Sequence, residues 1–100
     1  MTDPGNEKKN SVTLLTGNNY DAWALRTMVV ARKQQLEDMV TGNDDEPSTG
    51  RNSKGWKAWR DRRNAAAELI ISRLDDAQLV HIRGLEGDPA GMWVRLATVH

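Results

Sequence analysis

The stretch from Trp56 to Leu74, WKAWRDRRNAAAELIISRL, is the longest helical pattern in the chain and contains neither Gly nor Pro. At about 100° per residue, its apolar side chains fall within roughly a third of the helix circumference. They are Trp56, Trp59, Ala66, Ala67, Ile70, Ile71 and Leu74. So wide an apolar stripe is typical of a helix packed against several others, whereas a coiled coil has a narrow seam. We therefore predict that this stretch is the central helix of an all-helical domain.

A second helical pattern precedes the central helix and runs from about Tyr20 to Lys33. Asn18 or Asn19 is expected to cap its first turn, because Asn side chains accept backbone N–H groups at helix starts. Its apolar face consists of Tyr20, Trp23, Ala24, Thr27, Val30 and Ala31, widened by Met28 and Val29. A displaced apolar set then follows, namely Leu36, Met39 and Val40. This displacement indicates either a bend near residues 34–35 or a new short helix, which stops before Gly42.

The segment 43–55, NDDEPSTGRNSKG, contains only polar residues, Gly and Pro, and is predicted to be a mobile loop. Its first half is acidic and its second half is basic. Ser53, near the end of the loop, is a suitable N-cap for the central helix.

Two further helices are predicted after the central one. Either residue of the pair Asp75-Asp76 can cap a short helix through Ile82, which Gly84 would end in a left-handed conformation. The pair Asp88-Pro89 combines a capping side chain with a Pro suited to the first helical position, and it starts a helix that continues to about Val99. The predicted apolar face of this last helix consists of Ala90, Trp93, Leu96 and Ala97.

A chain of 100 residues is expected to form one domain. We predict a disordered tail at residues 1–13 and a single domain at residues 14–100, built as a compact orthogonal bundle of four to five helices. Four Trp, one Tyr and no Phe are present, so these aromatic side chains are expected to anchor the core. The predicted core anchors are Tyr20, Trp23, Trp59, Ile70, Leu74, Trp93 and Leu96.

Composition excludes several classes of protein. The absence of Cys removes disulfides, thiol catalysis and cysteine-ligated zinc. No apolar run approaches the ~18 residues of a membrane span, and the first residues do not resemble a secretory signal. We therefore expect a cytoplasmic protein without a membrane partner. The formal net charge is 0, although residues 1–50 carry 5 Lys/Arg and 8 Asp/Glu, and residues 51–100 carry 9 and 6.

The sequence shows no constellation of reactive side chains. His81 and His100 stand alone, so a metal site is not expected, and the pair Asp75-Asp76 is interpreted as a helix cap. No Gly-rich phosphate loop is present, and no Ser has a nearby His that could activate it. We therefore expect a protein without catalytic activity, cofactor or small-molecule substrate.

Residues 14–42, LLTGNNYDAWALRTMVVARKQQLEDMVTG, resemble the opening of copia-type retrotransposon Gag proteins in the order of their anchors. The matching residues are Leu15, Gly17, Asn19, Tyr20, Trp23, Met28, Leu36, Val40 and Gly42. Further matches are Trp59, Ala66, Ile70 and Leu74 in the central helix, and Ala90, Trp93 and Leu96 near the end. The chain departs from the family at Arg63 and Asn64, where the family usually has an acidic residue.

This resemblance implies a fold like the N-terminal domain of retroviral capsid proteins. It also implies a structural role, in which the protein assembles with copies of itself into virus-like particles around RNA. A domesticated host relative of the retrotransposon would be expected to show the same features.

The basic start of the central helix is a candidate contact for RNA or DNA, since cations neutralise phosphates and the interleaved Trp side chains can stack on bases. The residues concerned are Arg51, Lys54, Lys57, Arg60 and Arg62. The alternative interpretation is a solvated helix start whose Trp side chains belong to the core. In that case the acidic residues 44–46 of the loop are suitable partners, and Arg63 extends its stem over Trp59.

A second candidate surface consists of apolar residues that exceed what so small a core needs, and such a surplus usually marks a partner site. These residues are Met39, Val40, Leu79, Val80 and Leu85. They would mediate self-association, and the alternative is that they simply complete the core. A third hypothesis is an adaptor that holds a host peptide in a groove between helices.

Overall fold

The longest helix is α4, Lys54–Ile71, in the computed structural model of the protein, which describes residues 12–100. The other elements are the helices α2 (Tyr20–Lys33), α3 (Glu37–Thr41) and α5 (Pro89–Val99), and the 3₁₀ helix η1 (Asp76–Ile82). Across residues 12–100 the backbone forms no strand beyond an isolated parallel bridge between Leu15 and Leu74. The prediction of an all-helical chain is therefore confirmed, while the tail predicted at residues 1–13 lies almost entirely outside the described residues.

Three helix starts are stabilised by the capping side chains that the sequence predicts. The Oγ of Ser53 accepts the backbone N–H of Trp56 at 3.1 Å at the start of α4. The carboxylates of Asp75 and Asp88 accept N–H groups at the starts of η1 and α5, at 3.2 and 3.0 Å. Each cap satisfies a backbone donor that has no partner inside the helix, which explains why these boundaries agree with the sequence.

The start of α2 differs from the prediction. Asn19 occupies the N-cap position, but its side chain makes no hydrogen bond to the helix. Its Oδ1 instead accepts the backbone N–H of Thr16 at 2.8 Å, so this amide stabilises the preceding turn.

A new short helix, rather than a bend, follows α2. Gln35 adopts a left-handed conformation with φ 60°, and the N–H of Leu36 reaches back to the carbonyl of Ala31 at 2.7 Å. This is the hydrogen-bond pattern that ends a helix by satisfying its last carbonyl groups. Gly42, with φ 83°, ends α3 in the same backbone region.

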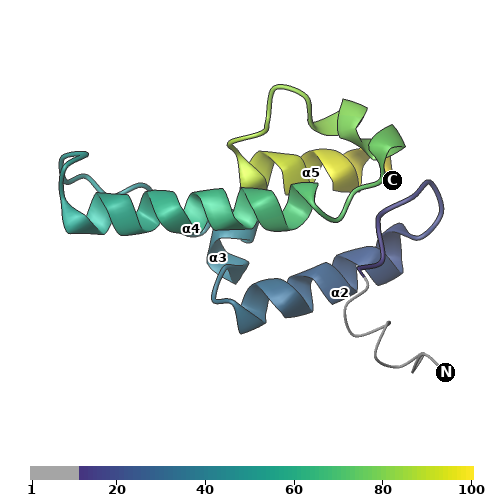
Figure 1. The fold of residues 1–100 in the computed structure, drawn as a ribbon, viewed down its shortest axis with the longest axis horizontal. Helices are drawn as coiled ribbons and strands as arrows, with labels where there is room; N and C mark the ends of the chain where they lie inside the picture. Colours follow the sequence, from purple (N-terminus) through teal and green to yellow (C-terminus); the bar gives the residue numbers. More distant parts are fainter. Residues whose placement is uncertain (1–11) are drawn as a thin grey trace, which may run out of the picture.

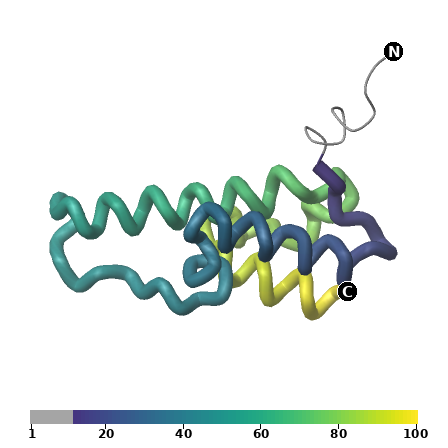
Figure 2. Tube along the Cα trace, turned by 90° about the horizontal axis from the view of Figure 1, so that it is seen from below, coloured from purple at the N-terminus to yellow at the C-terminus, as the bar shows by residue number. Residues whose placement is uncertain are grey.

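The long helices α2, α4 and α5 extend along the same direction in both views of the molecule, and the short α3 crosses them (Figures 1 and 2). The two views together show α2, α4 and α5 around a common centre, where the rings of Trp23 in α2 and Trp93 in α5 lie 5.5 Å apart, and α3 contacts all three helices. The N-terminal half of α4 projects beyond the other helices together with the loop that precedes it. This projecting part, residues 43–63, is called the tip below.

The core forms where α3, α5 and the C-terminal half of α4 meet α2. Of the predicted anchors, the structure buries Trp23, Trp59, Ile70, Leu74 and Leu96, and it leaves Tyr20 and Trp93 half-buried against the same core. The buried face of α5 is rotated from the prediction, because Met92 is fully buried and Ala97 is exposed.

Replacing Thr27 with Val is expected to stabilise the protein by about 1 kcal/mol. Thr27 is buried in α2, and its Oγ1 has no hydrogen-bond partner in the structure. Val has nearly the same shape and removes an unpaired polar atom from the core. Thermal unfolding followed by circular dichroism measures the effect. Thr98→Val is the matched control, since the Thr98 hydroxyl is exposed and donates to the carbonyl of Val94. A lower melting temperature for Thr27→Val than for Thr98→Val would contradict the prediction.

Candidate functional site

The acidic half of the loop packs against the basic start of α4 and holds the tip together. The backbone carbonyl of Asp44 accepts the indole N–H of Trp59 at 2.9 Å. The carboxylate of Asp44 accepts two hydrogen bonds from Arg62, at 2.8 and 3.1 Å. Glu46 accepts the indole N–H of Trp56 at 2.8 Å. The prediction that residues 44–46 are partners of the basic helix start is therefore confirmed for Asp44, whereas Glu46 binds an indole and no cation among the described residues.

The Asp44–Arg62 pair has electrostatic consequences for the tip. Its hydrogen bonds and the nearby negative charge raise the pKa of Arg62, against a smaller opposing effect of burial. Arg62 is therefore held as a cation by a partner within the chain. Because both side chains are partly exposed, we assign the pair a positional role rather than a large share of the stability.

Arg63 lies over Trp59, with its guanidinium carbon 5.0 Å from the ring centroid. The sequence predicts the stem of Arg63 over Trp59, and the structure instead places the guanidinium group itself over the ring. The Nε of Arg63 is buried without a hydrogen-bond partner, so the indole face is the contact that compensates for part of its desolvation.

Several of the candidate nucleic-acid residues already have partners within the chain. Arg62 is paired with Asp44, and Arg60 contacts the carboxylate of Asp61 at 3.1 Å. Arg51 and Arg60 lie over the ring of Trp56, at 5.5 and 5.7 Å.

Lys54 and Lys57 are the exposed lysines of this set, and they face away from Trp56. Two helical residues span about 200°, so Lys54 lies nearly opposite Trp56 on α4, and Lys57 is turned from it by about 100°. Base stacking on Trp56 would have to displace the guanidinium groups of Arg51 and Arg60, which already lie over its ring. This geometry favours the alternative interpretation, in which the basic residues serve the tip itself.

Two of the five predicted self-association residues need correction, because they belong to the core, as the alternative interpretation states. Met39 and Val40 are only 5% and 1% exposed. Leu79 and Leu85 are half-buried against the core. Burial follows from the position of α3, which lies among α2, α4 and α5. Val80 alone remains at the surface, with 59% of its area exposed.

The structure exposes a different apolar pair, on α2. Leu25 is 67% exposed and Val29 is 52% exposed, one helical turn apart. The sequence interpretation placed Val29 at the margin of the buried face and did not use Leu25. The helical spacing could have indicated this exposure, since at about 100° per residue both residues lie opposite the buried Trp23 and Thr27.

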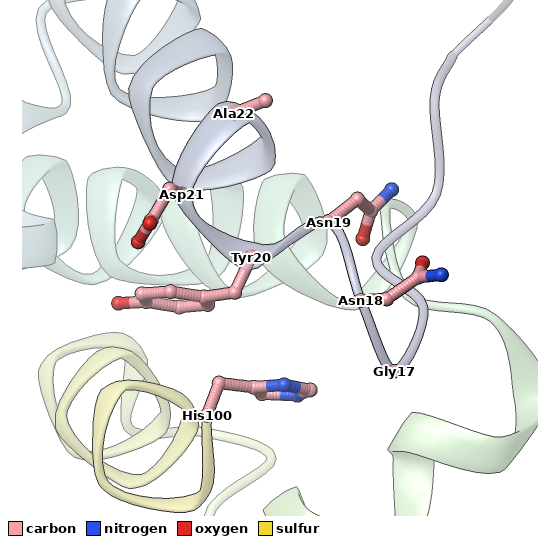
Figure 3. Close-up of a pocket in the computed structure, with 7 residues that line it drawn as sticks. All are labelled: Gly17, Asn18, Asn19, Tyr20, Asp21, Ala22 and His100. Atoms are coloured by element: carbon pink, nitrogen blue, oxygen red, sulfur yellow. The ribbon is translucent and has the colours of Figure 1, made fainter.

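A hollow of about 510 Å³ lies between the start of α2 and the end of α5 (Figure 3). Tyr20 and His100 face each other there with their rings stacked, at 5.5 Å between centroids and 3° between planes. A contact of 2.7 Å joins the Nε2 of His100 to the side-chain oxygen of Gln78. The lining residues include no Ser, Thr, Cys or Lys that could act as a nucleophile. The hollow therefore supports no covalent catalysis of that kind.

The pKa of Tyr20 is raised above its usual value near 10, first by burial and second by the adjacent charge of Asp21. The folded protein therefore holds the phenol proton more tightly than the unfolded chain does. The resulting contribution to stability is fully present below about pH 10 and is lost as the pH rises through the folded-state pKa.

Residues 12–100 contain no group of three or more His, Asp or Glu side chains placed to bind a metal ion. Over the same residues, no helix combines the length and the apolar character needed to cross a bilayer. Comparison of the chain with protein-family models, with curated proteins and with solved structures finds no match.

Proposed function

We propose that this chain is a structural domain of the copia-type Gag kind, which associates with copies of itself and carries out no reaction. One support is that residues carrying the resemblance also form the core. Six of them are almost completely buried, namely Leu15, Trp23, Val40, Ala66, Ile70 and Leu96. If this chain and the Gag proteins share a helical architecture, the residues that they have in common should pack in the core. A capsid-like bundle is part of the proposal.

The observation that carries the proposal is the apolar face that α2 presents to solvent. Leu25 and Val29 are large aliphatic side chains with more than half of their area exposed, and Ala22 lies beside them one turn toward the N-terminus. Exposed apolar groups gathered on one helix face, opposite the packed side, are typical of contact sites between proteins. We call Ala22, Leu25 and Val29 the outward face of α2.

Self-association competes with nucleic-acid binding as a use for this domain. The paired cations of the tip argue against a phosphate-binding surface, because Arg60 and Arg62 have carboxylate partners within the chain. The exposed apolar pair on α2 has no comparable partner in the structure. The balance of these two observations favours a protein partner, and in a Gag-like domain that partner is a second copy.

The proposal predicts concentration-dependent association. Sedimentation equilibrium between about 10 µM and about 1 mM is expected to give an average mass that rises above the 11.2 kDa of one chain. A mass of 11.2 kDa at every concentration would remove the proposed function. A single-stranded RNA titration at low salt separates the alternatives, since tight, salt-sensitive binding by a monomer would favour the nucleic-acid hypothesis.

A further inference from the structure

The outward face of α2 is centred opposite the helix face that packs on the core. Residues 25 and 29 are one turn apart, and the buried Trp23 and Thr27 lie about half a turn away from them. In Figure 1, α2 forms one side of the described molecule, and Leu25 and Val29 are 67% and 52% exposed.

Charged residues at the two ends of α2 lie along one edge of this face. Asp21 is in the first turn and Arg32 is in the last turn. The separation of eleven positions corresponds to about three full turns, so both side chains have nearly the same angular position on the helix. Asp21 is exposed, and 60% of the Arg32 side chain is exposed.

The Nε of Arg32 contacts Glu37 of its own chain at 2.9 Å. A guanidinium group has five N–H donors, so this contact leaves others free for a second carboxylate.

We propose that the outward face of α2 pairs with the same face of a second copy, with the two helices antiparallel. This inference rests on the proposed function and specifies the geometry of the self-association. A two-fold axis near the middle of α2 places Leu25 of one copy beside Val29 of the other. The same axis places Asp21 beside Arg32 of the second copy, twice in each dimer.

The helix dipoles favour this orientation, and the charges at the two ends of α2 match in it. A two-fold parallel pair would instead set the edge with Asp21 against the other edge of the partner, where Arg26 lies, and would align the two helix dipoles. The antiparallel pair brings opposite charges together, and its two helix dipoles point in opposite directions, which is also favourable.

The contact is small, and one of its edges is unfavourable. A helix of 14 residues is about 21 Å long, so a pair of them buries less than the ~1,000 Å² of a stable interface. Arg26 lies on the other edge near the centre of α2, where the axis brings the two copies of this cation together. The pairing is therefore weak on its own and suits an assembly in which many such contacts act at once.

The experiment is sedimentation equilibrium on the complete chain and on variants of α2. The double variant Leu25→Gln/Val29→Gln is expected to weaken the self-association constant by about tenfold or more. Val94→Gln is the matched control, because Val94 is 64% exposed on α5 and lies outside the proposed contact. Leu25, Val29 and Val94 are all exposed, so circular dichroism is expected to show unchanged folding in both variants.

Two further variants test the orientation. Asp21→Arg and Arg32→Asp are each expected to associate more weakly with themselves than the wild type does. An equal mixture of these two variants is expected to recover association, because every charge then meets its opposite. Arg26→Gln is expected to tighten association, which a general loss of folding cannot mimic.

The outcomes separate this inference from the proposed function. Association that survives Leu25→Gln/Val29→Gln, or that Val94→Gln weakens equally, would overturn the α2 contact and leave self-association in place. Failure of the charge-reversed mixture to recover would overturn the antiparallel arrangement. A wild-type chain that stays monomeric would overturn both.

Discussion

Trp23→Ala is expected to unfold the domain at room temperature or to bring it close to unfolding. Trp23 is 2% exposed, and its ring lies 5.5 Å from Trp93 and 6.2 Å from Tyr20, measured between centroids. Removing so large a buried side chain costs about 3–5 kcal/mol. The total stability of a small domain is about 5–15 kcal/mol.

The indole N–H of Trp23 adds to this cost. It donates to the carbonyl of Arg73 at 2.8 Å and so joins α2 to the segment that follows α4. The carbonyl of Arg73 also accepts the backbone N–H of Leu15 at 2.7 Å, so the alanine variant removes one of its two donors, at a further cost of about 0.5–1.5 kcal/mol. Chemical unfolding followed by circular dichroism at 222 nm measures the sum.

Trp23→Phe is the informative comparison for this position, since it keeps an aromatic ring and loses the hydrogen bond. Its destabilisation is expected to be smaller than that of Trp23→Ala. An alanine variant that unfolds like the wild type would show that this indole does not join α2 to the core.

Trp59→Ala is expected to cost about 3–5 kcal/mol and to release the loop of the tip. Trp59 is buried, its N–H donates to the carbonyl of Asp44 at 2.9 Å, and Arg63 stacks on its face. The variant would remove the ring that Arg63 covers and the bond that ties the loop to α4. Hydrogen exchange is expected to accelerate in residues 43–53, and chemical unfolding gives the overall loss of stability.

Trp56→Ala is the matched control, because Trp56 lies on the same turn of α4 and is only half-buried. Its loss is expected to cost less than the loss of Trp59, even though it frees Glu46. An equal effect of the two variants would contradict the assignment of Trp59 to the core.

Helix positions were largely predictable from the sequence because the signals that set them are local. The start of α4 depends on Ser53 and on a residue three positions later, and the start of α5 depends on Asp88 and Pro89 in the same way. The end of α3 depends on a single Gly that adopts φ 83°. The structure agrees with the sequence at each of these places.

The candidate contacts were less predictable, since burial depends on which elements meet. Met39 and Val40 form a surplus apolar set in the sequence, and they became core residues because α3 crosses between three other helices. Leu25 looks like one more apolar residue of α2, and it is exposed because it lies opposite the packed side. Helical angles indicate which residues share a face, but they do not state which face a neighbour covers.

By itself, the sequence determined that the described residues are helical, where most of the helices begin, and that aromatic side chains anchor the core. Caps, left-handed glycines and hydrophobic periodicity act over three or four residues, so they can be recognised in the sequence alone. Only the tertiary structure decided that Asp44 pairs with Arg62 and that Trp23 binds the carbonyl of Arg73, across 18 and 50 residues. Only the tertiary structure decided, too, that α2 leaves Leu25 and Val29 in solvent, because partners distant in sequence are chosen by packing rather than by local preference.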